Sequence, residues 1–423
     1  MRILYHCADH VGAEMAGPGI RAVELCRRLA SKHEVTLSAP GASALNGEPF
    51  TPSEYDPRTF AALLRRAEVF ISQGFGFPSS AVRAFRGRLV LDLYDPVQLE
   101  NLTRCQPAPT PEWRVSLVRL RLRLRKMIRR ADHVLCASPL QRALWLGWLG
   151  SLGRITPDCL DGDPTAARLL ALVPFGVSED PPAHAGHPLR VGLGLPLDTP
   201  LALWGGGLWD WMDPALAVRA FARLKSQGHS AHLALLAGSR PGVLQMRRRA
   251  DEARALTQEL QVADRVHFVD RWIPYAERGA YLLDADLAVS AHHPTLEAEL
   301  AFRTRLLDCL WAGLPVACTS GDVLASEADR DGWGIAVPPG DADGLATAIA
   351  ALLEPARRAQ AKVAAAEAAK RYQWATSAGV LLDLLDHPAP PRRRDLLPGE
   401  IGAERLSRII GALAAKALRR LRR

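Results

Sequence analysis

Short runs of apolar residues alternate along the chain with polar or glycine-rich loops and amphipathic stretches. In the first such unit, residues 3–7 form a mostly apolar run, residues 9–19 are polar and rich in glycine, and Ala22, Leu25 and Leu29 then recur at helical spacing. The order strand, loop, helix, strand is typical of a parallel sheet with helices on its faces. Further strands of this series are predicted at residues 33–39, 69–72, 89–92 and 133–136.

The alternation pauses near residues 172–177, and proline and glycine then cluster over residues 181–200, as is typical of a linker. A second series follows the linker, with strands predicted at residues 202–204, 233–237, 266–269, 285–290, 314–318 and 334–337. The pattern therefore predicts two α/β domains with doubly wound, Rossmann-like parallel sheets. The N-terminal domain is expected over residues 1–178 and the C-terminal domain over residues 179–387.

The composition is that of an ordinary globular protein. Of the 423 residues, 48% are hydrophobic and 23% are charged, which excludes a disordered or collagen-like chain. No stretch reaches the roughly 18 consecutive apolar residues that a membrane span needs, and the N-terminus lacks the apolar core of a signal peptide. We therefore expect a cytoplasmic protein. The seven cysteines include no Cys-x-x-Cys pair, so buried thiols are favoured over a zinc site, a disulfide framework or a catalytic cysteine.

Most of the net charge of +8 resides in the C-terminal tail expected over residues 388–423. The remainder is close to neutral, which does not support a nucleic-acid-binding core. The tail segment 401–423 combines arginines with apolar residues at helical spacing, and residues 113–130 combine eight basic residues with an apolar stripe. Either segment could lie on an anionic membrane surface, or pack by its apolar side on its own domain. The expected stripe consists of Leu117, Leu120, Leu124, Met127 and Ile128.

Two predicted strands open into glycine-rich loops that are followed by helices. Glycine allows close approach of the backbone to a ligand, and a helix N-terminus offers unpaired N–H groups and a positive dipole end. The two loops could thus hold phosphate groups at the carboxyl edges of both sheets, although each by itself could be a tight turn. The N-terminal loop supplies Gly17, Pro18, Gly19 and Arg21, and the C-terminal loop supplies Gly205, Gly206 and Gly207.

The densest group of charged residues follows the strand predicted at 285–290. Arg303 and Arg305 lie near a predicted helix start, where guanidinium groups could bind a diphosphate. Carboxylates in the same segment suit the hydroxyl pairs of a sugar or ribose. An exposed helix with a surface Arg–Asp pair is the alternative interpretation. The candidate carboxylates are Glu297, Glu299 and Asp308.

Residues 307–316, with the sequence Leu-Asp-Cys-Leu-Trp-Ala-Gly-Leu-Pro-Val, resemble a motif of glycosyltransferase family 4, whose members are retaining, nucleotide-sugar-dependent enzymes of the GT-B fold. The resemblance extends over about residues 1–385. It implies that Asp308 takes the place of the second glutamate of the family's Glu-x7-Glu motif, which holds the ribose hydroxyls. The first glutamate would fall at Leu300, so the resemblance assigns its role to Glu297 or Glu299.

The chain departs from the family in two further places. The family's Arg and Lys after the second glycine-rich loop are absent, and we expect Arg303, Arg305 and Arg271 to neutralise the diphosphate instead. The family's N-domain histidine has no clear match, which leaves Asp95 and His10 as candidates for a catalytic role. The sequence contains no Asp-x-Asp motif, in agreement with the metal-independent reaction that the resemblance implies.

The resemblance implies an EC 2.4 hexosyltransferase that needs no cofactor. Its donor would be a UDP-, GDP- or dTDP-sugar, and its acceptor a glycan, a lipid-linked intermediate of a cell-surface polysaccharide, or another small acceptor. Transfer is expected to proceed with retention, in the cytoplasm or peripherally on the inner face of the cell membrane. A sugar-nucleotide-binding subunit of the same fold with impaired catalysis and a sugar-nucleotide epimerase are the alternatives.

Overall fold

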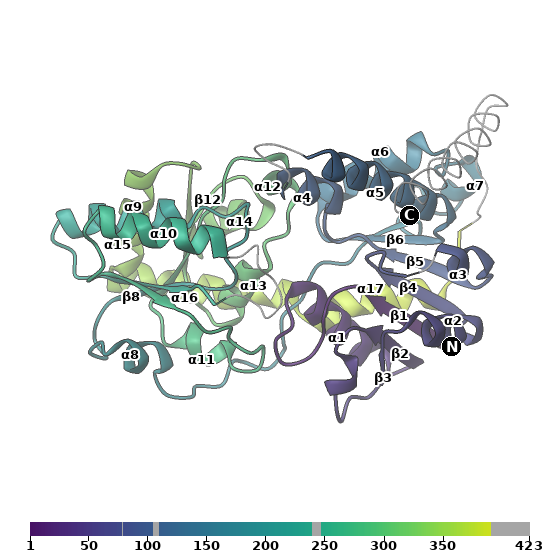
Figure 1. Ribbon diagram of the computed structural model, residues 1–423, viewed down its shortest axis with the longest axis horizontal. Helices are drawn as coiled ribbons and strands as arrows, with labels where there is room; N and C mark the ends of the chain where they lie inside the picture. Colours follow the sequence, from purple (N-terminus) through teal and green to yellow (C-terminus); the bar gives the residue numbers. More distant parts are fainter. Residues whose placement is uncertain (78, 105–109, 239–246, 391–423) are drawn as a thin grey trace, which may run out of the picture.

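A computed structural model of the protein describes residues 1–77, 79–104, 110–238 and 247–390. Within these residues the chain forms two parallel sheets with helices on both faces, and the two sheets lie side by side along the long axis of the molecule (Figure 1). This arrangement confirms the predicted pair of Rossmann-like α/β domains in a GT-B-like fold.

The N-terminal sheet has seven described strands in the order β3-β2-β1-β4-β5-β6-β7. All neighbours are parallel, with Tyr5 of β1 in register with Leu37 of β2 and Ile71 of β4. The apolar run at residues 3–7 is buried because helices cover both faces. The strands are β1 (Arg2–Cys7), β2 (Glu34–Ala39), β3 (Thr51–Glu54), β4 (Val69–Gln73), β5 (Arg88–Asp92), β6 (His133–Cys136) and β7 (Leu170–Leu172).

Two of these strands, β3 and β7, are absent from the sequence prediction. Strand β3 has the sequence Thr-Pro-Ser-Glu and lies at the sheet edge, where a proline is tolerated and no apolar run is required. The helices of this half, several of which begin with proline, are α1 (Gly17–Leu29), α2 (Pro57–Arg66), α3 (Ser79–Ala84), α4 (Val97–Arg104), α5 (Pro111–Arg130), α6 (Pro139–Ser151) and α7 (Pro157–Leu160).

The C-terminal sheet has six described strands in the order β10-β9-β8-β11-β12-β13. They are β8 (Leu201–Trp204), β9 (His232–Leu236), β10 (Val266–Val269), β11 (Leu287–Ser290), β12 (Val316–Thr319) and β13 (Gly334–Val337). The helices that follow the linker are α8 (Pro188–Leu193), α9 (Pro214–Ser226), α10 (Arg247–Glu259), α11 (Arg278–Leu283), α12 (Leu296–Leu300), α13 (Thr304–Trp311), α14 (Val323–Asp331), α15 (Ala342–Leu353), α16 (Pro355–Ala369) and α17 (Trp374–Asp386).

The last described helix returns from the C-terminal half to the N-terminal domain. Helix α17 packs on α1, and Trp374 at its start is fully buried against Phe175, with the ring centroids 4.8 Å apart. A side chain at Gly176 would collide with that indole, so glycine is required there. The backbone of Val177 also pairs with the segment around Gln373. These contacts between residues 175–177 and residues 373–374 join the two domains beside the cleft described below.

Several other predictions concern membrane spans, metal sites, cysteines and the C-terminal tail. No described helix is long and apolar enough to span a bilayer. No described group of three or more His, Cys, Asp or Glu side chains could hold a metal ion. The six cysteines in the described ranges are buried and form no disulfide, while Cys105 lies outside those ranges. The tail segment 401–423 also lies outside them.

Candidate functional site

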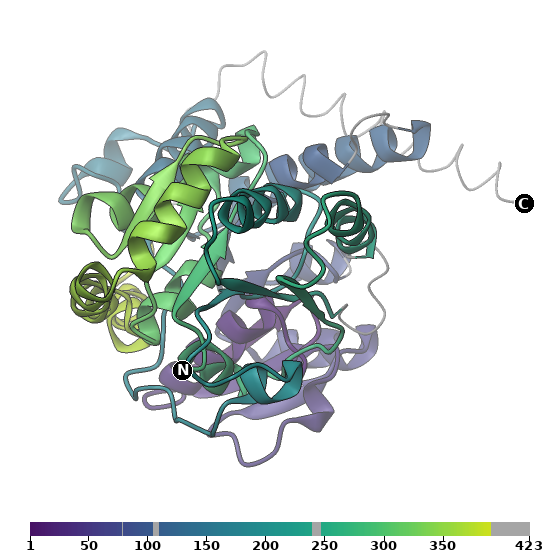
Figure 2. The same ribbon diagram turned by 90° about the vertical axis from the view of Figure 1, so that its left-hand side faces the viewer.

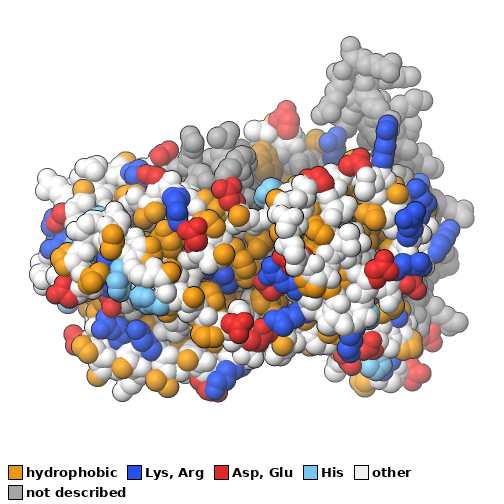
Figure 3. Space-filling view, turned by 90° about the horizontal axis from the view of Figure 1, so that it is seen from below, with side chains coloured by type: hydrophobic (Ala, Val, Ile, Leu, Met, Phe, Trp, Pro, Cys, Tyr) orange, Lys and Arg blue, Asp and Glu red, His pale blue; other side chains and the backbone are white. Residues whose placement is uncertain are grey.

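Two adjoining pockets open between the domains, at the carboxyl edges of the two sheets. We call them the arginine pocket, which contains Arg305 and Asp308, and the acidic pocket, which contains Asp95 and Glu297. In the view from below, charged side chains of both signs gather where the C-terminal domain on the left meets the N-terminal domain on the right (Figure 3). The two pockets share Ala16, Gly17, Trp209, Thr304 and Arg305.

The C-terminal glycine-rich loop and Arg305 form one wall of the arginine pocket. The Nη2 of Arg305 donates a hydrogen bond to the carbonyl oxygen of Gly207, at 2.7 Å. Gly206 has a φ of +86°, a conformation that favours glycine, and a side chain there would lie 3.8 Å from the Arg305 guanidinium. The loop therefore turns tightly enough to bring its backbone beside the arginine.

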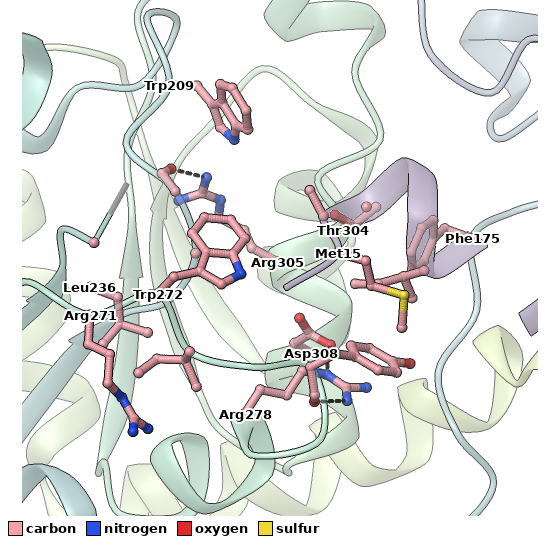
Figure 4. A pocket seen from close by; sticks show the side chains of 18 of the residues that line it. Met15, Phe175, Trp209, Leu236, Arg271, Trp272, Arg278, Thr304, Arg305 and Asp308 are labelled. Atoms are coloured by element: carbon pink, nitrogen blue, oxygen red, sulfur yellow. Dashed lines mark hydrogen bonds and ion pairs between the residues drawn. The ribbon is translucent and has the colours of Figure 1, made fainter. Parts of the chain in front are cut away.

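Arg305 is half-buried in the pocket wall, and no described carboxylate forms an ion pair with it. Its Nη1 is buried without a hydrogen-bond partner. Burial, with a smaller contribution from the neighbouring charge of Arg303, lowers the pKa of Arg305 to about 10. A buried cation without a counter-charge is costly. Its position in the pocket wall is suited to an anionic ligand (Figure 4).

Two helix N-termini meet at the same place. Helix α13 begins at Thr304 and helix α1 at Gly17, and neither helix has a side chain that caps its first turn. A side chain at Gly17 would lie 3.7 Å from the Oγ1 of Thr304, so the two helix starts are neighbours across the domain boundary. Free N–H groups and the positive ends of two helix dipoles therefore add to the charge of Arg305.

Asp308 lies in the same pocket, on α13 one turn beyond Thr304. Its Oδ1 accepts a hydrogen bond at 3.0 Å from the Nε of Arg278, whose guanidinium lies between Tyr275 and Trp311, 3.7 and 4.3 Å from the two ring centroids. This sandwich fixes the orientation of the carboxylate. No described side chain binds the Oδ2, so that oxygen can accept a hydrogen bond from a ligand hydroxyl.

The acidic pocket gathers carboxylates from both domains: Asp9, Asp95, Glu100 and Glu297. Burial, and then the charges of Glu100 and Glu297, raise the pKa of Asp95 well above its usual range, although a hydrogen bond with Tyr94 opposes the shift. Arg303 holds Glu297 by two hydrogen bonds, of 3.1 and 2.8 Å, in a buried ion pair. The pocket therefore offers hydrogen-bond acceptors and negative charge.

The raised pKa of Asp95 predicts a stability cost that grows with pH. An acid that prefers its neutral form in the folded state destabilises the fold as the pH rises above its unfolded pKa of about 3.9 and through the folded value. We therefore expect Asp95→Asn to raise the melting temperature at neutral pH by a few degrees, with the gain vanishing towards pH 4. Thermal melts from pH 4 to 8 measure this difference, and Asp198→Asn in an exposed loop is the control. A gain independent of pH would contradict the explanation.

Arg21 lies beneath the pockets and lines neither of them. Its guanidinium is fully buried and binds Asp92 through two hydrogen bonds, of 2.8 and 3.0 Å. It also donates to the carbonyl oxygens of Val173 and Pro174. Tyr5 donates a third hydrogen bond to the same Asp92 carboxylate. Because all these groups are enclosed, Arg21 connects α1, β5 and the chain after β7, and the prediction that it forms part of the ligand-binding loop does not match its position.

Three other candidates either lie apart from the pockets or point away from Arg305. His10 is exposed and faces Gly41 on the far side of its loop, and Glu299 is exposed on α12. Arg271 borders the arginine pocket, but its guanidinium binds Glu277 and Tyr281 and points away from Arg305 (Figure 4).

Only some residues of the two predicted glycine-rich loops line a pocket. Gly17 and Pro18 line the acidic pocket, and Gly206 and Gly207 line the arginine pocket, whereas Gly205 and Gly19 line neither. Gly19 has a packing role, since a side chain there would approach the carbonyl oxygen of His10 to 2.6 Å.

Aromatic residues of the site are missing from the sequence prediction. Trp209 borders both pockets and stacks on Trp211, with ring centroids 5.5 Å apart and planes 8° from parallel. Trp272 lines the arginine pocket, and its indole N–H is buried without a hydrogen-bond partner (Figure 4). The pair of tryptophans directly after the glycine-rich loop is the sequence signal that could have indicated Trp209.

Two facing Rossmann-like domains with a cationic pocket at the carboxyl edges of both sheets are the architecture of the GT-B fold. The family model of glycosyl transferases group 1 matches residues 199–355. That segment covers β8 to β13, so the match lies within the C-terminal domain.

Solved structures with the same fold match nearly the whole chain. Sucrose-phosphate synthase from Thermosynechococcus elongatus is 19% identical, with a TM-score of 0.65 over 91% of this chain and 98% of the other. HepE from Anabaena, in complex with UDP-glucose, is 17% identical, with a TM-score of 0.67 over 91% and 99%. The trehalose-6-phosphate synthase OtsA is 11% identical, with a TM-score of 0.65 over 92% and 100%. A search of curated proteins finds no match.

Proposed function

We propose that the protein transfers a sugar, with retention, from a nucleotide diphosphate to a sugar-containing acceptor. The observation that carries the proposal is the arginine pocket, where Arg305, the loop at Gly206 and Gly207 and the starts of α1 and α13 converge on one space. A diphosphate suits this space because a guanidinium and the free N–H groups at helix starts all bind phosphate oxygens.

The donor would extend through both pockets. Its diphosphate would contact Arg305, and the ribose hydroxyls would bind the Oδ2 of Asp308, whose other oxygen is held by Arg278. The sugar would reach towards the acidic pocket, where Glu297 is oriented by Arg303. HepE, which has the same fold, binds UDP-glucose, and this favours a UDP-sugar among the possible donors.

The two pockets would stabilise opposite charges during the transfer. As the bond to the sugar breaks, negative charge grows on the leaving diphosphate, and Arg305 with the helix dipoles is preorganised to meet it. Positive charge grows on the sugar ring, and the carboxylate of Glu297 lies on that side. Closure of the two domains would exclude water and limit hydrolysis of the donor.

The acceptor would enter on the side of the acidic pocket. We propose a glycan or a lipid-linked intermediate of a cell-surface polysaccharide, processed in the cytoplasm or at the inner face of the cell membrane. The basic segments 113–130 and 401–423 are the candidates for peripheral contact with an anionic membrane. The first of these corresponds to helix α5.

Nucleotide release with a panel of UDP-, GDP- and dTDP-sugars tests the proposal. Release that an acceptor stimulates supports transfer. Binding of a nucleotide sugar without turnover would instead support a catalytically impaired subunit, and turnover without any acceptor would support an epimerase or a hydrolase. A thermal-shift screen identifies the donor first, because a bound ligand stabilises the fold by mass action.

Replacement of Asp308 tests the ribose contact. We expect Asp308→Ala to weaken donor binding by about 1–3 kcal/mol, because the ribose hydroxyls lose a charged acceptor. Isothermal titration with the donor measures the change, and Asp251→Ala on the exposed face of α10 is the control. Unchanged affinity in Asp308→Ala would remove this residue from the site.

A further inference from the structure

Helix α5 presents apolar side chains on two opposite faces. Leu124, Met127 and Ile128 are buried in the core of the N-terminal domain. By contrast, Val115, Val118 and Leu122 are 41%, 44% and 49% exposed. Successive residues of a helix are rotated by about 100°, so these three lie together on the side opposite the buried face. We call them the α5 strip.

This result modifies the expectation from the sequence. The stripe predicted from Leu117 to Ile128 is the face that packs on the domain: Leu124, Met127 and Ile128 are buried and Leu117 and Leu120 are half-buried. The α5 strip is a second apolar surface, and the packing of the protein does not account for it.

Basic residues border the α5 strip on both sides. Arg119 and Lys126 follow one edge, and Arg114, Arg121 and Arg125 follow the other; all five are exposed. The helix carries no acidic residue after Glu112, and no described carboxylate forms an ion pair with any of the four arginines. The like charges of these four arginines repel one another, so they point to an anionic partner outside the domain.

The position of α5 suits a broad, flat partner. The helix extends beyond the edge of the two domains, with its N-terminal part on the outside (Figure 2). Helix α4 packs on α5, carries the exposed Leu102, and places Glu100 in the acidic pocket. A surface that contacts α5 would therefore lie beside the pocket that we assign to the acceptor.

We propose that the α5 strip inserts at the headgroup boundary of an anionic lipid bilayer while the flanking arginines bind lipid phosphates. An apolar strip between two rows of cations is the pattern of an interfacial helix, whose long basic side chains reach the headgroups while the apolar residues enter the acyl region. A nucleic acid would leave the apolar residues without a partner. The proposal rests on the proposed function for its consequence, delivery of a membrane-held acceptor to the acidic pocket.

Sedimentation with vesicles tests the docking directly, using the full chain without nucleotide sugar. We expect binding to vesicles of phosphatidylglycerol and phosphatidylcholine, weakening with salt, and little binding to phosphatidylcholine alone. The double variant Val118→Asp/Leu122→Asp should bind about tenfold more weakly, because two carboxylates would enter the headgroup region. Val363→Asp, at an exposed valine of α16 on the other domain, is the matched control and should bind normally.

Several results would overturn the docking proposal. They are unchanged vesicle binding by the double variant, equal binding to neutral vesicles, or a concentration-dependent dimer that the double variant abolishes while vesicle binding persists. Melting temperature and donor titration, measured on the same samples, show that each variant is folded with an intact arginine pocket. Failure of the proposed function would appear in the donor titration of the unaltered protein, and failure of docking only in the vesicle experiment.

Discussion

Replacing Arg305 by alanine should reduce the turnover of the donor by about 10²–10³-fold, the effect typical of removing one preorganised group that stabilises transition-state charge. The variant loses the cation that faces the glycine-rich loop and that no described carboxylate neutralises. Donor affinity should fall less than turnover, because the charge on the diphosphate increases as the sugar departs. Steady-state nucleotide release and donor titration together separate the two effects.

Three comparisons define this experiment. Arg305→Lys should recover part of the activity, since it restores the charge without the planar fork. Arg271→Ala should have a much smaller effect, because that guanidinium is bound to Glu277 on the outer side of the pocket. Arg223→Ala, at an exposed ion pair on α9, is the control. Equal turnover in Arg305→Ala and the parent protein would show that other groups neutralise the diphosphate.

Replacing Arg21 by alanine should have its largest effect on stability. Breaking a buried ion pair by removal of one partner costs about 3–5 kcal/mol, because the other charge remains enclosed. Here Asp92 would keep only its hydrogen bond from Tyr5, and the carbonyl oxygens of Val173 and Pro174 would lose their donor. Urea unfolding measures the loss in the free energy of unfolding.

The matched control is an exposed pair of the same two residue types. Arg330→Ala removes a partner of Asp331 on the surface of α14, where the expected cost is at most about 1 kcal/mol. The double variant Arg21→Met/Asp92→Leu should recover part of the stability, since no isolated charge is left. A loss in Arg21→Ala no larger than that in Arg330→Ala would mean that water reaches Asp92.

The two experiments separate roles that look alike in the sequence. Arg21 follows a glycine-rich loop and Arg305 lies near a predicted helix start, and both are natural candidates for binding a diphosphate. In the fold, Arg21 has a carboxylate partner and two carbonyl acceptors, whereas Arg305 has one carbonyl acceptor and borders open space. We therefore expect the first to support the shape of the cleft and the second to act on the ligand.

The same distinction explains which parts of the candidate site were predictable. Gly206, Gly207 and Asp308 were found because a loop after a strand and a charged helix start are local patterns, and both reach the arginine pocket. Asp95 was found because it stands where the resemblance places the family's N-domain histidine, and it lies in the acidic pocket. His10 follows a strand as well, but its ring lies beside Gly41 and borders neither pocket, although the neighbouring Asp9 lines the acidic pocket. Nothing local in the sequence indicates which of these two side chains reaches the pocket.

The sequence by itself determined the two parallel sheets, since alternation of buried strands and amphipathic helices is a local property of each segment, and it placed the glycine-rich loops at their carboxyl edges. Tertiary structure alone decided which arginine is paired. Arg21 meets Asp92, 71 positions away, while Arg303 is held by Glu297 and Arg271 by Glu277. Which carboxylate lies within hydrogen-bonding distance of each guanidinium depends on how the loops and helices pack. A buried charge is stable only where the fold places a partner beside it.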